Sequence, residues 1–94
     1  MRVKIKGFLT FKDSVKAQIL DLAEKERNSL RDLLIRVSLE NKIGNSLYRA
    51  DLGTINQNVL VLVNGRNLTN LVDGLDTLLQ DGDEIAIFPP LAGG

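Results

Sequence analysis

The amino-acid sequence predicts an α+β domain in which one main helix packs on one face of a mixed β-sheet. Three observations support this fold class: an alternating strand pattern at the N-terminus, one amphipathic helical pattern, and apolar runs of strand length in the C-terminal half. A chain of 94 residues has room for a single core. Aliphatic side chains must fill that core, because only four residues are aromatic, namely Phe8, Phe11, Tyr48 and Phe88.

The first strand is predicted over residues 2–11, where apolar and polar side chains alternate as in a strand with one buried face. Phe8 falls on the outer side, beside cationic side chains. Residues 12–16 supply a turn, and residues 17–24 are expected to form a second strand that completes a hairpin. The side chains expected on the buried side of the first strand are Val3, Ile5, Leu9 and Phe11.

The main helix is predicted within residues 24–44. Asn28 or Ser29 can cap its start, because either side chain can accept a hydrogen bond from a free backbone N–H. Lys42 suits the last turn, and Gly44 is expected to adopt the left-handed conformation that ends many helices. The i, i+3, i+4, i+7 spacing predicts a buried stripe of Leu30, Leu33, Leu34 and Val37.

Shorter elements are predicted in the rest of the chain. Residues 45–58 are expected to be a loop with one helical turn. The apolar run in residues 59–67 predicts a central strand, ended by a tight turn at Asn64-Gly65. Residues 68–80 favour a short strand and a single helical turn, and residues 81–88 a turn followed by the last strand.

This order of elements predicts a β-grasp (ubiquitin-like) roll, in which the first and last strands run parallel in the middle of the sheet. Residues 1–88 are expected to form the domain, and residues 89–94 a flexible C-terminal diglycine tail. The N-terminal strand carries only cations, whereas only acids follow Asn67. These charges would complement each other on neighbouring strands, although scattered solvated charge explains them equally well.

Composition narrows the function classes. A formal net charge of zero argues against direct binding of nucleic acid. The absence of cysteine and histidine removes thiol nucleophiles, imidazole bases and the usual ligands of a zinc site, so we expect no metal and no independent enzyme. No apolar run has the length of a membrane span and the N-terminus looks like a strand, which predicts a cytoplasmic protein without membrane contact. The acidic run at residues 81–84 resembles a calcium loop, but a type I turn with Gly82 explains it better.

An exposed apolar patch is predicted on the outer face of the sheet. Phe8 and Phe88 both fall on that face, on strands expected to be neighbours, and Leu62 would extend the patch. Such patches on small proteins usually bind partners. A covering loop, or a register shifted by one residue, would remove the patch.

The last six residues, 89–94, predict a projecting arm that a partner can bind. Their two prolines favour an extended backbone, and Leu91 can fill a small apolar pocket. Gly93 gives a slender approach, and the carboxylate of Gly94 is expected to be the reactive group. A carboxylate becomes acylating only when it is joined to AMP from ATP. The expected contacts along the arm are Pro89, Pro90, Leu91 and Ala92.

Two stretches of the C-terminal half, VLVNGRN and LDTLLQDGDEIAIFPPLAGG, resemble the MoaD/ThiS sulfur carriers and the related small archaeal modifier proteins. The resemblance is strongest to MoaD, the small subunit of molybdopterin synthase, and covers the last third of the chain. Residues 16–57 agree with it only in pattern. The extra length of this chain lies mostly in that middle region and in LTNLVDGLD, an insertion that also occurs in modifier-like members.

The resemblance implies a function. An adenylating enzyme of the ubiquitin-activating type would use ATP to form an acyl-adenylate on Gly94, which a persulfide would convert to a thiocarboxylate. The carrier would then dock on the large subunit of molybdopterin synthase and supply sulfur for the pterin dithiolene. Phe8, Leu68 and Phe88 match the contact positions of the family. The chain itself would bind no cofactor, because ATP belongs to the partner.

Other outcomes stay open at this point. The same terminus could serve transfer-RNA thiolation, or be attached to lysines of target proteins through an isopeptide bond. A plain interaction module with an incidental diglycine is a further alternative, and an enzyme in its own right is disfavoured by the side-chain inventory.

Overall fold

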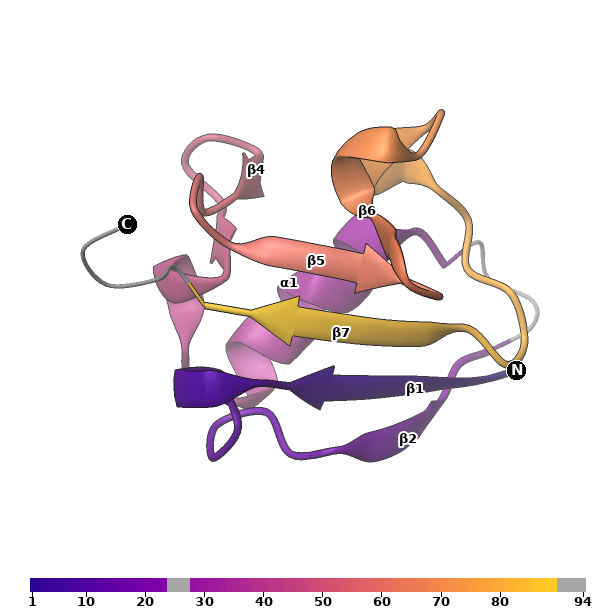
Figure 1. The fold of residues 1–94 in the computed structure, drawn as a ribbon, viewed down its shortest axis with the longest axis horizontal. Coiled ribbons are helices and arrows are strands. Elements are labelled where there is room, and N and C mark those ends of the chain that lie inside the picture. Colours follow the sequence, from indigo (N-terminus) through magenta and orange to yellow (C-terminus); the bar gives the residue numbers. More distant parts are fainter. Residues whose placement is uncertain (24–27, 90–94) are drawn as a thin grey trace.

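A five-stranded mixed sheet in the order β2-β1-β7-β5-β6 forms one layer of the fold (Figure 1). The computed structural model describes residues 1–23 and 28–89. In it β1 and β7 are parallel neighbours in the middle of the sheet, and the other pairings are antiparallel. The predicted β-grasp topology is therefore confirmed. The strands of this sheet are β1 (Arg2–Gly7), β2 (Gln18–Asp21), β5 (Leu60–Val63), β6 (Arg66–Asn67) and β7 (Glu84–Phe88).

The pairing of β1 with β7 brings the two ends of the domain together. Lys4 lies opposite Glu84 in the register, and their side chains form an ion pair at 3.7 Å. The backbone N–H of Arg2 donates to a carboxylate oxygen of Asp81 at 2.7 Å. Lys4 is thus paired with an acid of the C-terminal half, as the charge pattern predicted, whereas the guanidinium of Arg2 pairs with Asp21 of β2.

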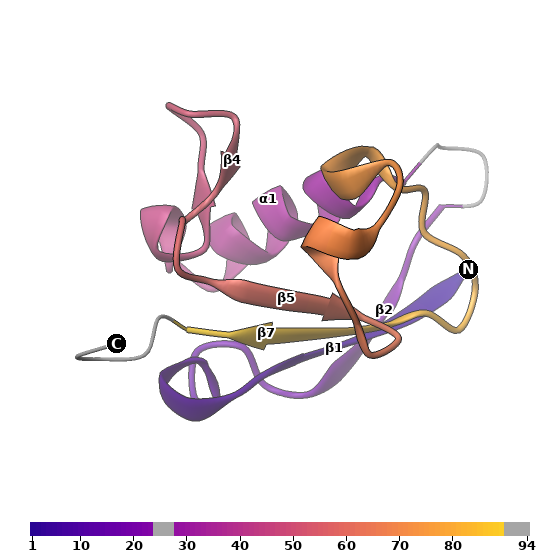
Figure 2. The same cartoon turned by 45° about the horizontal axis from the view of Figure 1, so that its top comes forward.

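The helix α1 (Leu30–Glu40) covers one face of the sheet, as the turned view shows (Figure 2). Its N-cap is Ser29, whose hydroxyl oxygen accepts a hydrogen bond from the N–H of Asp32 at 3.1 Å. The predicted stripe is buried, and it packs against the inward side chains of the strands. The most deeply buried large side chains of the core are Val3, Ile5, Val15, Leu30, Leu34, Val37, Leu47, Val61 and Ile87.

The helix ends differently from the prediction. Gly44 is left-handed as predicted, but Lys42, which precedes it, is left-handed too, with φ of 56°. The N–H of Ile43 donates to the carbonyl of Ser38, and the N–H of Lys42 to that of Leu39. These two bonds define a Schellman motif with Lys42 at its left-handed position.

The first strand is shorter than the alternation predicted. β1 ends at Gly7, and residues Leu9–Phe11 form a 3₁₀ turn, η1. A side chain at position 7 would place its Cβ 2.5 Å from the carbonyl oxygen of Phe11, so only glycine lets the chain fold back there. Phe11 is buried as expected, but Leu9 is 59% exposed, which corrects its assignment to the buried side.

Short elements flank the helix beside the sheet. The loop expected over residues 45–58 holds a small hairpin, and the short strand expected in 68–80 is replaced by two 3₁₀ turns. In the first of these turns the side chain of Asn67 accepts a hydrogen bond from the N–H of Thr69, which favours a turn over a strand. The elements are η2 (Gly44–Ser46), β3 (Tyr48–Arg49), β4 (Thr54–Ile55), η3 (Leu68–Asn70) and η4 (Gly74–Asp76).

The two predicted turns of the C-terminal half are present. Asn64 and Gly65 have φ of 52° and 83°, which fits the tight turn between β5 and β6. The turn before β7 closes with a bond from the N–H of Asp83 to the carbonyl of Gln80. Its Gly82 has φ of 87°, so this is a type II turn and not the expected type I.

The described residues offer neither a membrane span nor a metal cluster. None of their helices is long and apolar enough to cross a membrane. They contain no group of three or more acidic, histidine or cysteine side chains arranged to hold a metal ion.

Candidate functional site

The outer face of the sheet carries two stacked aromatic rings beside the point where the chain leaves β7. The rings of Phe8 and Phe88 lie 4.5 Å apart between centroids, with 11° between their planes. The backbone holds this pair in place, because the N–H of Phe8 donates to the carbonyl of Ile87 at 2.9 Å. Ile85 and Ile87 point into the core, so the predicted register is correct and Phe88 faces outward.

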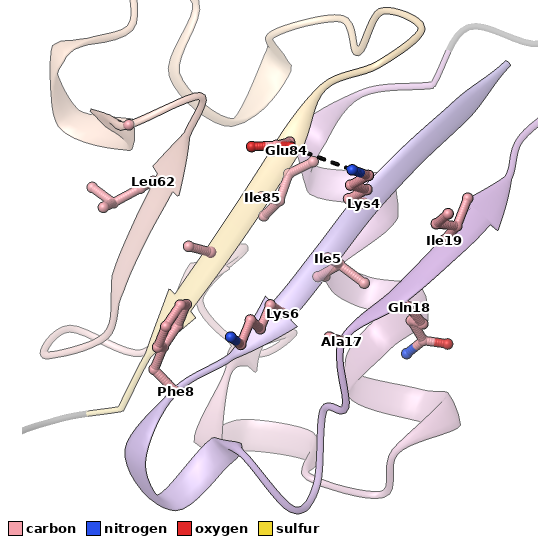
Figure 3. A pocket seen from close by; sticks show the side chains of 12 residues that line it. Lys4, Ile5, Lys6, Phe8, Ala17, Gln18, Ile19, Leu62, Glu84 and Ile85 are labelled. Carbon is pink, nitrogen blue, oxygen red and sulfur yellow. Dashed lines mark ion pairs between the residues drawn. The ribbon is translucent and has the colours of Figure 1, made fainter.

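A shallow groove of about 460 Å³ lies on the same face and reaches from β2 to β5 (Figure 3). Phe8, which directly follows β1, lines it together with Leu62 of β5 and Ala86 of β7, so the predicted residues Phe8 and Leu62 share one surface. Leu62 lies opposite Ala86 in the register of β5 and β7. Ile19 of β2 closes the far side of the groove.

Two lysines of this face, Lys4 and Lys6, have different partners. Lys4 is paired with Glu84, as the dashed line in Figure 3 marks. The ammonium of Lys6 instead lies 4.9 Å from the centre of the Phe8 ring, in a cation–π contact. The result is an apolar groove with a positive charge beside its aromatic end. Such a surface can bind a partner.

Two predicted contact residues, Leu68 and Pro89, are buried in the domain. Leu68 is only 7% exposed and packs with the core, where it also lines a second hollow between the β3–β4 hairpin and η3–η4. Pro89 is buried as well. Neither position is the exposed one expected of a partner-binding side chain. The remaining predicted residues of the arm lie outside the described residues: Pro90, Leu91, Ala92, Gly93 and Gly94.

Sequence reasoning missed two residues of this face, Ile19 and Lys6. Ile19 is 59% exposed on β2 and lies opposite Lys4. The period-two alternation of the second predicted strand places it outward and could have identified it. The contact of Lys6 with a ring two residues later in the chain depends on the chain's turn after Gly7.

Among the described residues, the resolved pKa shifts arise in ion pairs that do not line this groove. A hydrogen bond from the guanidinium of Arg49 lowers the pKa of Asp51, and the same pair raises the pKa of Arg49. Arg31 of α1 pairs with Asp76 of η4, and that hydrogen bond raises the pKa of Arg31. The Arg31–Asp76 pair connects α1 to η4, whereas the Arg49–Asp51 pair lies within the β3–β4 hairpin.

Comparison with known proteins identifies the family. A family model described as the ThiS family matches residues 14–94. The small archaeal modifier protein 3 of Haloferax volcanii is 32% identical over 94 residues and covers 100% of both chains. A molybdopterin synthase sulfur carrier subunit of Drosophila ananassae is 31% identical over 78 residues, which is 83% of each chain.

A solved structure agrees with these relatives. Small archaeal modifier protein 1 of Methanosarcina acetivorans superimposes with a TM-score of 0.76 at 26% identity, over 99% of this chain and 96% of that one. Members of this family are small ubiquitin-like carrier proteins rather than catalysts. Since the family match spans most of the chain and the sheet has the same β-grasp topology, this protein belongs to the ThiS/MoaD family of ubiquitin-like sulfur carriers and modifiers.

Proposed function

We propose that the protein carries sulfur on the carboxyl group of Gly94 and delivers it for molybdopterin synthesis, as the non-catalytic small subunit of a molybdopterin synthase. The observation that supports this proposal is the Phe8–Phe88 stack, an aromatic pair at the end of β7 that would serve as an apolar docking surface next to the diglycine segment. A carrier needs such a surface beside its reactive end, because each enzyme it serves must bind the domain and receive the terminus together.

The chemistry takes place in partners. In a ubiquitin-activating-type enzyme, an oxygen of the Gly94 carboxylate attacks the α-phosphorus of ATP, and pyrophosphate leaves. The resulting mixed anhydride is attacked at its carbonyl carbon by a persulfide sulfur, and AMP leaves. Reductive cleavage of the sulfur–sulfur bond by a thiol then gives the thiocarboxylate and a disulfide. This chain supplies the docking surface and the reactive terminus, while ATP is bound by the partner.

The similarity to a molybdopterin synthase sulfur carrier subunit supports the dithiolene as the acceptor of the sulfur. In that role the Phe8–Phe88 surface docks on the large synthase subunit after leaving the adenylating enzyme. The two partners would then use the same face in turn, which suits a carrier that must be released between steps.

Protein modification is the second candidate function. It is favoured by the end-to-end similarity to a small archaeal modifier protein. Adenylation of Gly94 is shared by both candidates, and they differ in the nucleophile that follows: sulfur in one, the amine of a target lysine in the other. Thiolation of transfer RNA would use the sulfur branch with a different acceptor.

Intact-mass analysis tests the shared proposal. The purified chain is incubated with the adenylating enzyme from the same organism, ATP and a sulfur donor. We expect the exchange of one oxygen for sulfur at Gly94, and none when ATP is omitted. An unchanged mass with an enzyme that is active on another carrier would contradict the sulfur-carrier function.

A second experiment separates the candidates. Cells that express the tagged chain are immunoblotted, and molybdopterin is measured in a strain that lacks the gene. Loss of molybdopterin without higher-mass conjugates supports sulfur delivery to the pterin. A ladder of conjugates with normal molybdopterin supports protein modification instead.

A further inference from the structure

Leu9 combines two properties that are unfavourable in the isolated domain. Its backbone is left-handed, with φ of 54°, a conformation that side chains other than those of glycine, asparagine and aspartate rarely adopt. Its apolar side chain is also 59% exposed. The other described residues with positive φ, glycines aside, are Lys42 and Asn64, which are polar. Leu9 is thus the strained position among them that also exposes an apolar side chain.

The surrounding structure enforces this conformation. The N–H of Phe8 is bonded to the carbonyl of Ile87, which fixes the entry to η1 on β7. The N–H of Phe11 donates to the carbonyl of Phe8 at 3.0 Å, and the N–H of Lys12 to that of Leu9 at 3.0 Å. The ring of Phe11 is buried in the core. Because these contacts do not involve the side chain of Leu9, the turn would form equally well with asparagine at this position.

The location of η1 suggests why a leucine stands there. In both views η1 lies beside the C-terminal end of β7, where the chain leaves the sheet (Figures 1 and 2). Six residues, 89–94, follow that end and span at most about 20 Å when fully extended. Any enzyme that takes Gly94 into its active site must therefore approach this end of the domain closely, and it meets η1 there.

We propose that Leu9 is a docking residue for the adenylating enzyme, whose apolar surface at the mouth of the tail-binding channel would bury the leucine side chain. This inference rests on the proposed function, because adenylation of Gly94 is what brings that enzyme to this end of the domain. Burial in the complex offsets both the backbone strain and the exposed apolar area, and no contact among the described residues does so. Leu9 follows Phe8 directly in the chain, so it would extend the Phe8–Phe88 surface.

The test replaces Leu9 with asparagine, which tolerates the left-handed backbone but removes the apolar contact. The adenylating enzyme from the same organism is assayed by ATP–pyrophosphate exchange with wild-type and variant carriers. For L9N we expect a melting temperature higher by ~3 °C, a KM for the carrier raised about 10-fold, and kcat within about twofold of wild type. L9M keeps an apolar side chain and should retain a KM within about twofold of wild type.

Leu52→Asn is the matched control, because Leu52 is a 64% exposed leucine on the β3–β4 hairpin, away from η1. Its KM should not change. An unchanged KM for L9N, with wild type adenylated normally, would overturn this inference alone. A raised KM together with a lowered melting temperature would also overturn it, since the residue would then be structural. If wild type is not adenylated at all, the proposed function is wrong, and the inference about Leu9 is wrong with it.

Discussion

At the scale of single residues, Ser38 on α1 is the one buried polar side chain of the described core. Its hydroxyl finds no hydrogen-bond partner among the described residues. Burying a hydroxyl without a partner costs free energy, and alanine also has the higher helix propensity. We expect Ser38→Ala to raise the free energy of unfolding by about 1 kcal/mol, measured by urea denaturation. A loss of stability would mean that the hydroxyl is bonded in solution.

A second prediction at this scale concerns Asp51. The hydrogen bond from Arg49 lowers the pKa of its carboxyl group in the folded state. A lowered folded pKa stabilises the fold above the unfolded pKa, and this stabilisation is lost as the pH falls through the folded pKa. Asp51→Asn should therefore lower the melting temperature slightly at pH 7 and not at all once the carboxyl is protonated. Because the pair is exposed, 1 M salt should also reduce the difference.

At the scale of the element, the C-terminus of α1 carries a left-handed residue other than glycine. Lys42 occupies the position of the Schellman motif where glycine is preferred. Lys42→Gly should raise the free energy of unfolding by about 0.5–1 kcal/mol, because the same φ is unstrained for glycine. Lys42→Ala is the control: it removes the same charge but keeps the strain, so it should give no gain. Equal effects of both variants in thermal unfolding would contradict this explanation.

At the scale of the whole molecule, we expect the fold not to depend on the proposed reactive terminus. The buried core of the described residues runs from Val3 to Ile87, and a glycine has no side chain to add to it. Deleting Gly93 and Gly94 should leave the free energy of unfolding unchanged within about 0.5 kcal/mol. The same deletion should abolish ATP–pyrophosphate exchange and sulfur transfer. A truncated chain that still accepts sulfur would show that the diglycine is not the acceptor.

Local patterns in the sequence predicted most of the fold, because the spacing of apolar residues along a helix or strand shows which of its faces is buried. The i, i+3, i+4, i+7 leucines located α1, and the alternation around Ile85 and Ile87 placed Phe88 on the outer face. The same alternation failed after Gly7, where the chain folds back into η1. A glycine inside a strand pattern is a signal of such a close approach, and it was present in the sequence.

Local sequence patterns were enough to predict the order of the main elements, the aliphatic core, the aromatic outer face and the chemistry open to a diglycine end. Which side chains share a surface followed only from the tertiary fold. It joined Phe8 to Phe88 from opposite ends of the chain, exposed Leu9 and buried Leu68. The physical reason is that periodicity fixes the face on which a side chain lies, whereas stacking, strain and burial depend on contacts between residues far apart in the chain.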